Sequence, residues 1–380
     1  MIEVVRAGLL TTVQDLGRPG FRHLGVATGG ALDTLALEVG NRLVGNRPDA
    51  AGLEITFGPV ALRFARATRV AITGTEFGAT LGGKAVWSWW SLPVAAGEEL
   101  VLHGAKRGMR GYVCVAGGID VLPMLGSRST DLAAGFGGLA GRALKDGDRL
   151  AIGASFAPAV RPGGRERAAL DALAPAFGVK APAWCNFVLA EEAHGLERRR
   201  GRHPEGAAWA PPVRVLRGPE YDSFTPEAQQ AFWHDEWQLT PNSNRMGFRL
   251  TGTALARSDS ADLLSHAVLP GTIQVPPSGQ PIVLMSDAQT TGGYPKIGAV
   301  IRADLWKLAQ VRLTGGVRFV ETTPAVARAA LEEERAYLRQ IDTAIAMHDE
   351  RYASRRAVSV AVSKPAAAMA HGAPGETSGT

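Results

Sequence analysis

The sequence contains few of the residues that build disulfide-linked or metal-binding proteins. Only two cysteines, Cys114 and Cys185, occur in 380 residues, and they fall in different halves of the chain. Neither belongs to a Cys-x-x-Cys pair or to a Cys/His spacing that holds zinc. The eight histidines are scattered singly. We therefore expect free thiols, no disulfide framework and no metal site.

Long apolar runs are also missing. No stretch approaches the roughly 18 to 20 apolar residues that span a bilayer. Residues 1–6 lead directly into a strand pattern rather than into the apolar core of a signal peptide. A hydrophobic fraction of 46% nevertheless suffices for well-packed cores. We expect a soluble, cytoplasmic globular protein that makes no membrane contact.

Several catalytic and nucleotide-binding signatures are absent. The chain has no Walker A loop, no Gly-x-Ser-x-Gly elbow, no His-Glu-x-x-His motif and no paired-Asp metal loop. The net charge of +5 comes largely from scattered arginines, with one short basic run at residues 197–203. No stacking aromatic residues interleave with that run. We interpret it as a solvated loop and expect no nucleic-acid partner.

Glycine and proline are abundant, with 46 and 23 residues, and short runs of Val, Ile and Leu lie between them. This pattern favours a mainly β protein with tight turns and a few helices. Helical periodicity is predicted at residues 31–44, with Asp33 near the start, and at 226–233, with Thr225 as N-cap. The short run at 311–313 is predicted to be a strand.

The pattern also divides the chain. We expect one β domain at residues 1–155, a linker at 156–212 where Ala, Pro, Arg and Gly prevail, and a second β domain at 213–323. A Thr-Pro start and an apolar stripe then predict a C-terminal helix at 324–350. The remaining residues, 351–380, are mostly small or polar and are expected to be disordered.

The densest run of hydrogen-bonding side chains and glycines is at residues 286–298. It follows an apolar, strand-like run at 281–285, so its polar side chains emerge at a strand end. Gly292 and Gly293 let backbone N–H groups approach a ligand closely, and Lys296 adds positive charge. We expect a pocket for a polar, anionic small molecule, although the same residue types also suit an ordinary turn.

Two further polar, glycine-rich stretches occupy residues 11–18 and 126–131. The first contains Asp15 and Arg18, which suit either a ligand or a capped turn. The second places Arg128 among three hydroxyls and a carboxylate, which suits an oxyanion as well as a Ser-rich turn. The residues alone allow the three polar stretches to converge, and they do not define a reaction.

Six motifs occur in the order found in one known family. They lie at residues 11–20, 30–33, 41–46, 126–131, 244–247 and 289–298. The chain resembles the biotin-dependent carboxyltransferase family, which includes the C subunit of 5-oxoprolinase and the carboxyltransferase domain of urea amidolyase. The name allophanate hydrolase subunit 2 attaches to the same family. The resemblance covers about residues 1–155 and 213–322.

This resemblance implies two cyclophilin-like β-barrel domains in one chain and work with partner subunits. In the 5-oxoprolinase assembly, subunits A, B and C open the lactam 5-oxoproline to glutamate at the expense of ATP. In urea carboxylase, the similar domain moves a carboxyl group from carboxybiotin to urea. Both reactions handle an amide-like nitrogen and an anionic activated group.

The resemblance also implies site residues. Catalytic roles fall to Asp287 and Gln289, which would orient the substrate amide, and to Lys296 and Arg128, which would stabilise an oxyanion or phosphate together with backbone N–H groups. The residues implied to bind substrate are Gln14, Asp15, Arg18, Thr130, Asp131, Asn244, Arg245, Thr290, Thr291, Gly292, Gly293 and Tyr294.

The sequence departs from the usual family pattern at three positions. Gly29 stands where a serine is usual, His266 where a glutamate is usual, and Ala288 where an arginine is expected beside Gln289. These departures remove a hydroxyl, a carboxylate and a positive charge.

Three functions remain open from the sequence. The C subunit of an ATP-dependent 5-oxoprolinase is favoured, because the chain has neither an Ala-Met-Lys-Met biotin-attachment motif nor a biotin carboxylase segment. The second is a carboxyltransferase subunit that takes carboxybiotin from a carrier on another chain. The third is a non-catalytic regulatory partner of the B subunit, since the family also includes a protein that binds an inhibitor of a sporulation kinase.

Overall fold

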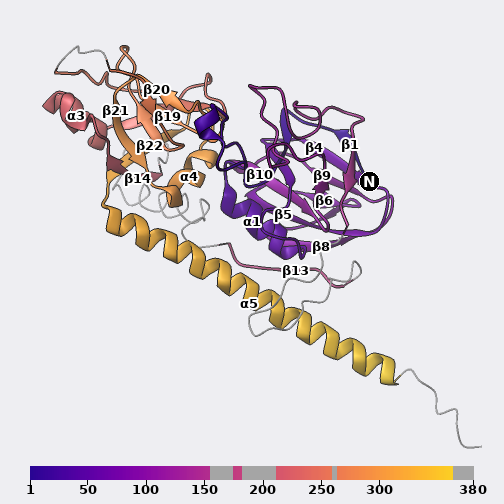
Figure 1. The fold of residues 1–380 in the computed structure, drawn as a ribbon. Helices are drawn as coiled ribbons and strands as arrows, with labels where there is room; N and C mark the ends of the chain where they lie inside the picture. Colours follow the sequence, from indigo (N-terminus) through magenta and orange to yellow (C-terminus); the bar gives the residue numbers. More distant parts are fainter. Residues whose placement is uncertain (155–173, 182–210, 259–262, 363–380) are drawn as a thin grey trace, which may run out of the picture.

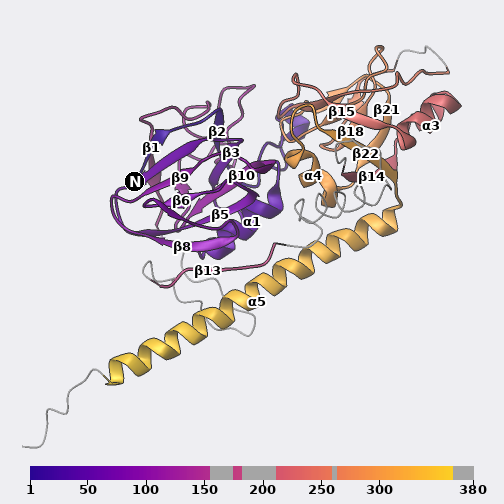
Figure 2. The ribbon, with the colours of Figure 1, turned by 180° about the vertical axis from the view of Figure 1, so that it is seen from behind.

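A computed structural model describes residues 1–154, 174–181, 211–258 and 263–362. These residues form two β-rich bodies that lie side by side along one long C-terminal helix (Figures 1 and 2). We call residues 1–152 the N-terminal body and residues 212–321 the C-terminal barrel. No helix among the described residues combines the length and the apolar character needed to cross a membrane.

The N-terminal body contains two sheets of antiparallel strands, and strand β13, from the described segment 174–181, adds an edge strand to the second sheet. One has seven strands in the order β11-β12-β1-β4-β9-β6-β7, and the other has six in the order β13-β8-β5-β10-β3-β2. The strands are β1 (Ile2–Arg6), β2 (Leu10–Gln14), β3 (Gly52–Thr56), β4 (Val60–Phe64), β5 (Thr68–Glu76), β6 (Thr80–Leu81), β7 (Lys84–Ala85), β8 (Trp90–Val94), β9 (Glu99–Leu102), β10 (Arg107–Val115), β11 (Ile119–Asp120), β12 (Arg149–Ile152) and β13 (Phe177–Gly178).

One apolar cluster joins the two sheets of this body. Ile2 and Val4 of β1 and Leu53 and Ile55 of β3 are fully buried in it. Successive side chains of a strand point to opposite faces, so the apolar residues at alternate positions meet between the sheets.

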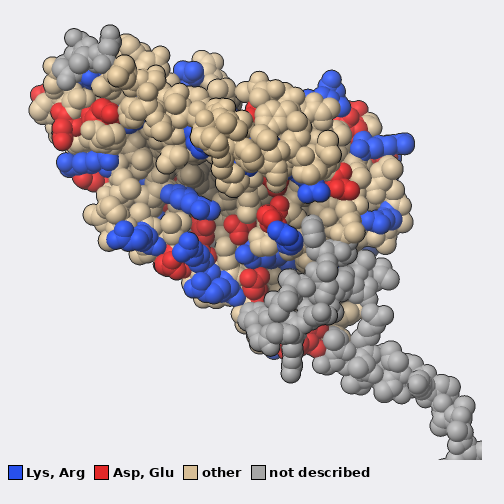
Figure 3. All heavy atoms as spheres, in the orientation of Figure 1, with Lys and Arg blue, Asp and Glu red and all other residues tan. Residues whose placement is uncertain are grey.

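Helix α1 (Thr34–Leu43) covers the outer face of β5 and β10. It begins at Asp33, whose side chain accepts a hydrogen bond from the backbone N–H of Ala36 at 3.0 Å. Helix α5 (Pro324–Val362) packs against α1 through Leu338 and Ile341 and against η4 (Arg302–Asp304) of the other body. Side chains of both charge signs are interspersed along the band occupied by α5 (Figure 3). Both bodies therefore pack against the same helix.

The C-terminal barrel is closed, in the order β14-β21-β18-β19-β16-β15-β22. Strands β14 and β22 close it in parallel, with Val213 opposite Phe319. Trp237, Phe232 and Phe319 fill its core. The strands are β14 (Pro212–Arg217), β15 (Glu236–Leu239), β16 (Gly247–Thr251), β18 (Thr272–Gln274), β19 (Ile282–Leu284), β21 (Lys296–Val300) and β22 (Gly316–Glu321).

Smaller elements decorate the two bodies. Strands β17 (His266–Ala267) and β20 (Thr291–Gly292) pair outside the barrel. Helix α3 (Pro226–His234) begins at Thr225, whose hydroxyl accepts from Ala228 N at 3.2 Å. Helix α4 (Leu305–Gln310) packs against β10 across the boundary between the bodies. The remaining short elements are η1 (Arg22–Leu24) and η3 (Tyr221–Ser223).

The mainly β prediction is confirmed, as are the helices predicted at 31–44 and 226–233. The strand predicted at 311–313 is wrong. The periodicity missed helix α4, and the backbone N–H of Val311 still bonds to carbonyls of that helix, which leaves 311–313 to form the turn before β22. The run looked like a strand because its apolar residues, Val311 and Leu313, stand at alternate positions around Arg312.

The C-terminal helix extends beyond its predicted end at residue 350 and ends at Val362. No glycine or proline interrupts 351–362, and alanine and arginine favour helix there. The rest of the expected tail, 363–380, and the basic run at 197–203 lie outside the described residues. Within the predicted linker, residues 174–181 are held to the N-terminal body, because β13 pairs with β8 and Arg69 Nη1 donates to Ala174 O at 2.6 Å.

Candidate functional site

A cavity of about 540 Å³ opens where the two bodies meet. Most of its wall is apolar, with a small number of polar groups, which is the usual make-up of a small-molecule site. Met246 and Leu313 at its rim are more than a third exposed. Its lining residues are Leu9, Leu10, Thr56, Met109, Arg110, Leu132, Ala133, Leu239, Ser243, Asn244, Arg245, Met246, Phe248, Asp287 and Leu313. We call this cavity the cleft.

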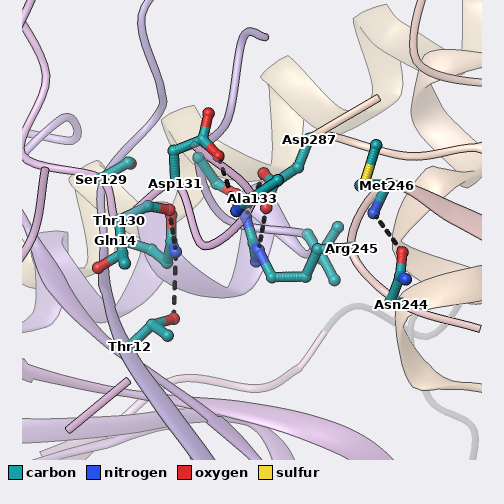
Figure 4. A network of polar contacts seen from close by, with 12 residues as sticks. Thr12, Gln14, Ser129, Thr130, Asp131, Ala133, Asn244, Arg245, Met246 and Asp287 are labelled. Atoms are coloured by element: carbon teal, nitrogen blue, oxygen red, sulfur yellow. Dashed lines mark hydrogen bonds and ion pairs between the residues drawn. The ribbon is translucent and has the colours of Figure 1, made fainter. Parts of the chain in front are cut away.

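Arg245 organises the polar part of the cleft wall. Its Nε and Nη2 atoms donate to the two carboxylate oxygens of Asp287 at 2.9 and 3.0 Å. Its Nη1 donates to Glu54 Oε1, and Nη2 also donates to the carbonyl oxygen of Gly30. Figure 4 shows the pairing of Arg245 with Asp287, with Asn244 and Met246 beside them. Arg245 and Asp287 come from the barrel and Glu54 comes from β3, so this buried network joins the two bodies.

The two carboxylates that share Arg245 have different acidities. Burial by itself raises the pKa of Glu54, but Arg245 and Arg110 outweigh it, and the pKa of Glu54 is lowered. Burial raises the pKa of Asp287, and here Arg245 offsets the rise only in part. Environments that push two carboxyl pKa values apart are typical of sites that separate a fixed charge from a proton carrier. Asp287 is therefore the better candidate for holding or moving a proton.

The network continues into the N-terminal body. Tyr112 donates its hydroxyl hydrogen to Glu54 Oε2 at 2.7 Å and accepts from Asp33 N at 2.8 Å. Gln310 of α4 donates to Asp33 Oδ2 and to Arg110 O, both at 2.9 Å. Burial raises the pKa of Asp33 to about 6, although hydrogen bonds from Ala36 and Gln310 oppose the rise. These contacts fix the relative position of the two cleft walls.

The stretches at 11–18 and 126–131 do come together. Asp15 Oδ1 accepts from Ser127 Oγ at 2.6 Å and from Ser129 Oγ at 2.5 Å. Its carboxylate also accepts from the backbone N–H groups of Gly17 and Arg128, at 2.7 and 2.6 Å. Three of these donors bond to Oδ1 and one to Oδ2, so most of the carboxylate's ordinary capacity is occupied. Asp15 therefore ties the two loops together and offers little to a substrate.

Gln14, Thr130 and Asp131 also serve this junction. Gln14 Nε2 donates to Thr12 Oγ1 and to Thr130 O, both at 3.1 Å. The Thr130 hydroxyl donates to Val13 O at 3.0 Å. Asp131 Oδ1 accepts from Ala133 N at 3.1 Å, next to the cleft wall (Figure 4).

Arg18 is the least satisfied charged group near the cleft. Its side chain is 1% exposed and lies over the ring of Phe136, and Nη2 donates to Ser129 O. Its Nε and Nη1 atoms are buried and have no hydrogen-bond partner among the residues that the structure describes. Burial lowers the pKa of Arg18, and Asp131, Asp15 and Asp287 oppose that change. Buried guanidinium N–H groups normally find acceptors, so two spare donors here suit a ligand oxygen.

Gly29 brings Arg18 close to Asp287. A Cβ atom on Gly29 would lie 3.0 Å from Arg18 Nη1 and 4.0 Å from Asp287 Oδ1. The φ angle of Gly29 is +65°, a conformation that L side chains rarely adopt. The usual serine would crowd the guanidinium here, so the departure at Gly29 is consistent with the close approach of these two groups.

Arg128 and Lys296, which the resemblance implies to be a pair of oxyanion donors, face different neighbours. The Arg128 side chain is partly exposed and lies 3.4 Å from Asp120. Lys296 contacts His266 and donates to Gly292 O at 3.0 Å. No hydrogen bond or ion pair joins Arg128 to Lys296 in the described part of the chain.

The last predicted stretch divides between two places. Asp287 lies in the cleft wall, whereas Gln289 turns toward Gln274, with Nε2 donating to Gln274 Oε1 at 3.4 Å. Thr291 and Gly292 form β20. The remaining residues of this hairpin are Thr290, whose carbonyl accepts from Val268 N, Gly293, which faces Ser265, and Tyr294, which is 47% exposed.

Sequence reasoning missed Glu54, Tyr112, Arg110, Gln310 and Arg22. Glu54 could have been predicted from the sequence as half of a buried ion pair, because a carboxylate inside an apolar strand needs a buried cation. Arg22 of η1 donates to Gln289 O at 3.1 Å and also to Val268 O. It brings a guanidinium to the loop where Ala288 stands in place of the expected arginine. Ala288 itself is fully buried in an apolar cluster with Val268 and Leu284.

Comparisons with known proteins agree on one family. Residues 24–321 match the family model described as "Carboxyltransferase domain, subdomain A and B". The chain is 45% identical over 350 residues to the C subunit of the 5-oxoprolinase of Escherichia coli, covering 92% of this chain and 100% of that protein. It is 38% identical over 341 residues to the corresponding 5-oxoprolinase protein of Haemophilus influenzae, covering 90% and 97%.

A solved structure supports the same assignment. The K. lactis urea amidolyase structure superposes with a TM-score of 0.73 at 28% identity, and the match covers 90% of this chain but 20% of that one. The chain therefore corresponds to one part of that larger enzyme. The match of the family model over most of the chain shows that this protein belongs to the carboxyltransferase domain family that contains subdomains A and B.

Proposed function

We propose that this chain is the C subunit of an ATP-dependent 5-oxoprolinase, which acts with subunits A and B to open 5-oxoproline to glutamate. The observation that carries the proposal is the 45% identity that extends over the whole of a protein named as the C subunit of 5-oxoprolinase. The match extends across both bodies and is not confined to one motif.

The cleft suits a small cyclic amide. A lactam presents its N–H and C=O on one edge, so it needs an acceptor and a donor side by side. Asp287 accepts from Arg245 at both oxygens and keeps a second lone pair on each for a ligand N–H. Arg18 holds spare donors beside Gly29, close to Asp287. Apolar walls from Leu132, Met246 and Phe248 match the ring methylenes.

Roles follow from these positions. Asp287 orients the lactam nitrogen and, with a pKa that burial raises, is the carboxyl group placed to pass a proton to that nitrogen as the ring opens. Arg245 and Glu54 hold Asp287 in place. Arg18 donates to the carbonyl oxygen as charge develops on it. Gln289 supports the hairpin beside this site, and Arg128 acts through its backbone N–H, which anchors Asp15.

The cleft residues do not suit the triphosphate of ATP. Arg245 is fully paired, and Arg110 lies over Phe248 and donates to Ala309 O. The carboxylates of Asp287 and Asp131 add negative charge nearby. ATP in the assembly supplies the activation of the amide, and we assign no ATP-binding step to this chain.

The test is 5-oxoproline-dependent ATP hydrolysis and glutamate formation by this chain mixed with its cognate subunits A and B. We expect both products to require all three subunits, and Asp287→Asn to slow glutamate formation by about 100-fold while the complex still assembles. Full activity of subunits A and B alone would refute the proposal.

A second candidate is carboxyl transfer from carboxybiotin to an amide or urea. The family description and the superposition on the K. lactis urea amidolyase favour it. The same cleft would serve, since urea also pairs a carbonyl with N–H groups. If the assembled complex ignores 5-oxoproline, free carboxybiotin and urea are the substrates to supply next, with loss of the carboxyl group from biotin as the readout.

A further inference from the structure

A second polar cluster lies on the C-terminal barrel, built from residues other than the cleft wall. Lys296 at the start of β21 contacts His266 Nε2 and donates to Gly292 O at 3.0 Å. His266 Nε2 also lies 3.3 Å from Glu220 Oε1. Glu220 Oε2 accepts from the backbone N–H of Lys296 at 2.9 Å. The three residues come from β21, β17 and the segment that follows β14, and we call them the lysine cluster.

The cluster runs from the interior to the surface. Lys296 is 3% exposed. The side chains of Glu220 and His266 are 17% and 46% exposed. An imidazole that touches a buried amine on one side and water on the other is a path along which a proton can move.

The contacts also fit an unprotonated amine better than an ammonium. An ammonium has three N–H donors. In the described part of the chain Lys296 Nζ has two hydrogen-bond partners, Gly292 O, to which it donates, and His266 Nε2, with which it can either donate or accept. The neutral amine has two donors and a lone pair, which matches these two contacts. Burial lowers the pKa of Lys296, and Glu220 opposes this change in part.

One nitrogen of His266 is shared between two partners. Nε2 lies against both Lys296 Nζ and Glu220 Oε1. A hydrogen on Nε2 points either to the carboxylate or to the amine, so the proton of the pair has two nearby positions. Glu220 and His266 are the titratable groups in contact with Lys296 among the described residues.

We propose that Lys296 is an acid–base group that works as a free amine, with His266 exchanging its proton with solvent and Glu220 holding His266 in position. In the exchange, the Lys296 ammonium gives one proton to His266 Nε2, and the imidazolium releases a proton to water. The amine then accepts a proton from a bound ligand. His266 and Glu220 are positioning residues, and they act through Lys296.

This differs from the role that the family resemblance implies, in which Lys296 is a permanent cation beside an oxyanion. It also explains how the chain tolerates histidine at position 266. A glutamate there would pair with the lysine and keep it charged, whereas the imidazole leaves it free to lose its proton. The inference concerns the protonation of this chain and does not depend on the identity of the substrate.

The test is the titration of Lys296 in the intact chain. Trace acetylation with acetic anhydride, from about pH 6 to pH 11, is followed at each lysine by mass spectrometry. Exposed Lys84 serves as the internal reference. Burial slows the labelling of Lys296 at every pH but does not move the midpoint of its profile. We expect a midpoint below that of Lys84.

Two variants separate control of protonation from mere packing. His266→Glu is expected to raise the midpoint of Lys296 by about one pH unit, because it adds a carboxylate beside the ammonium. Glu220→Gln keeps an acceptor for the backbone N–H of Lys296 and is expected to lower the midpoint. His234→Gln, on α3, is the matched control and should leave it unchanged.

Equal midpoints for Lys296 and Lys84, or a Lys296 midpoint that neither variant moves, would overturn the proposal. Failure of 5-oxoproline turnover would refute the proposed function and leave the titration intact. The two results can therefore be told apart. In an active assembly, His266→Gln should shift the pH profile of kcat more than it changes KM.

Discussion

The cleft and the lysine cluster both contain buried charge, but they differ in how completely that charge is paired. Every guanidinium nitrogen of Arg245 meets an acceptor, and both of its carboxylate partners are buried with it. Lys296 instead contacts the partly exposed imidazole of His266 and one backbone carbonyl, that of Gly292. Complete pairing fixes geometry at the cleft. Incomplete pairing leaves the proton at the lysine cluster free to move.

This difference suggests a division of labour. Groups that must hold a ligand benefit from a network of buried ion pairs, because the loss of any one partner strongly destabilises the fold. Groups that must exchange protons need a neighbour in contact with water. Changes to the paired network around Arg245 should therefore have larger effects than changes to the lysine cluster.

Arg245→Met should have the largest effect. It leaves Glu54 and Asp287 buried without their cation, which costs about 3–5 kcal/mol in measured cases. We expect a corresponding loss in the free energy of unfolding, measured by urea denaturation. Arg63→Met, which removes surface ion pairs with Glu3 and Glu99, is the control and should cost about 0–1 kcal/mol. Equal losses would show that Arg245 does not carry the network.

Asp287→Asn should affect turnover more than folding. The amide keeps the shape of the side chain but cannot carry the proton, so we expect kcat to fall by about 100-fold in the assembled enzyme. Asp120→Asn removes the exposed partner of Arg128 and should leave kcat unchanged. A normal kcat in Asp287→Asn would show that another residue carries the proton.

Tyr112→Phe should weaken the connection between the bodies. The variant removes a donor to Glu54 and leaves Asp33 N without its acceptor, a loss of about 1–3 kcal/mol in the free energy of unfolding. Thermal or urea unfolding measures it. Tyr294→Phe, at a half-exposed position, is the comparison, and a similar loss there would argue against a special role for the buried hydroxyl.

The smallest effect is a contrast in pH dependence. The folded-state pKa of Glu54 is lowered, so its contribution to stability is present above its unfolded value and is lost as pH falls through the folded value. The folded-state pKa of Lys296 is lowered below 10.5, so the unfolded state binds more protons between the two values and stability rises there with pH.

The measurement is the free energy of unfolding of the wild type, Glu54→Gln and Lys296→Met across acid and alkaline pH. Glu54→Gln should remove part of the acid dependence, and Lys296→Met should remove the alkaline rise. If either variant changes the opposite limb of the profile, the assignment of charge states to the two regions is wrong.

Much of the fold follows from local signals. Alternating apolar residues predicted the strands, and Asp33 and Thr225 marked the starts of two helices because a cap bonds to N–H groups three residues away. Helix α4 was not predicted because its six residues are too few to show a helical period. The predicted end of α5 at residue 350 was too early, because small and polar residues do not end a helix in the absence of glycine or proline.

Part of the candidate site could also be predicted from the sequence. The polar stretches around Asp15 and Arg128 stood out, and the structure brings them together. Their roles could not be predicted, because the sequence does not distinguish a carboxylate that joins two loops from one that contacts a ligand. Asp15 has four protein donors, whereas Asp287 faces a cavity.

By itself the sequence determined the β class, the main helix starts and the polar residue types from which a site is made, because these depend on neighbours within a few positions. The tertiary structure alone decided which charges meet. Arg245 and Glu54 are 191 residues apart in the chain and belong to different bodies. Their contact depends on how two folded bodies pack, and no local pattern encodes that distance.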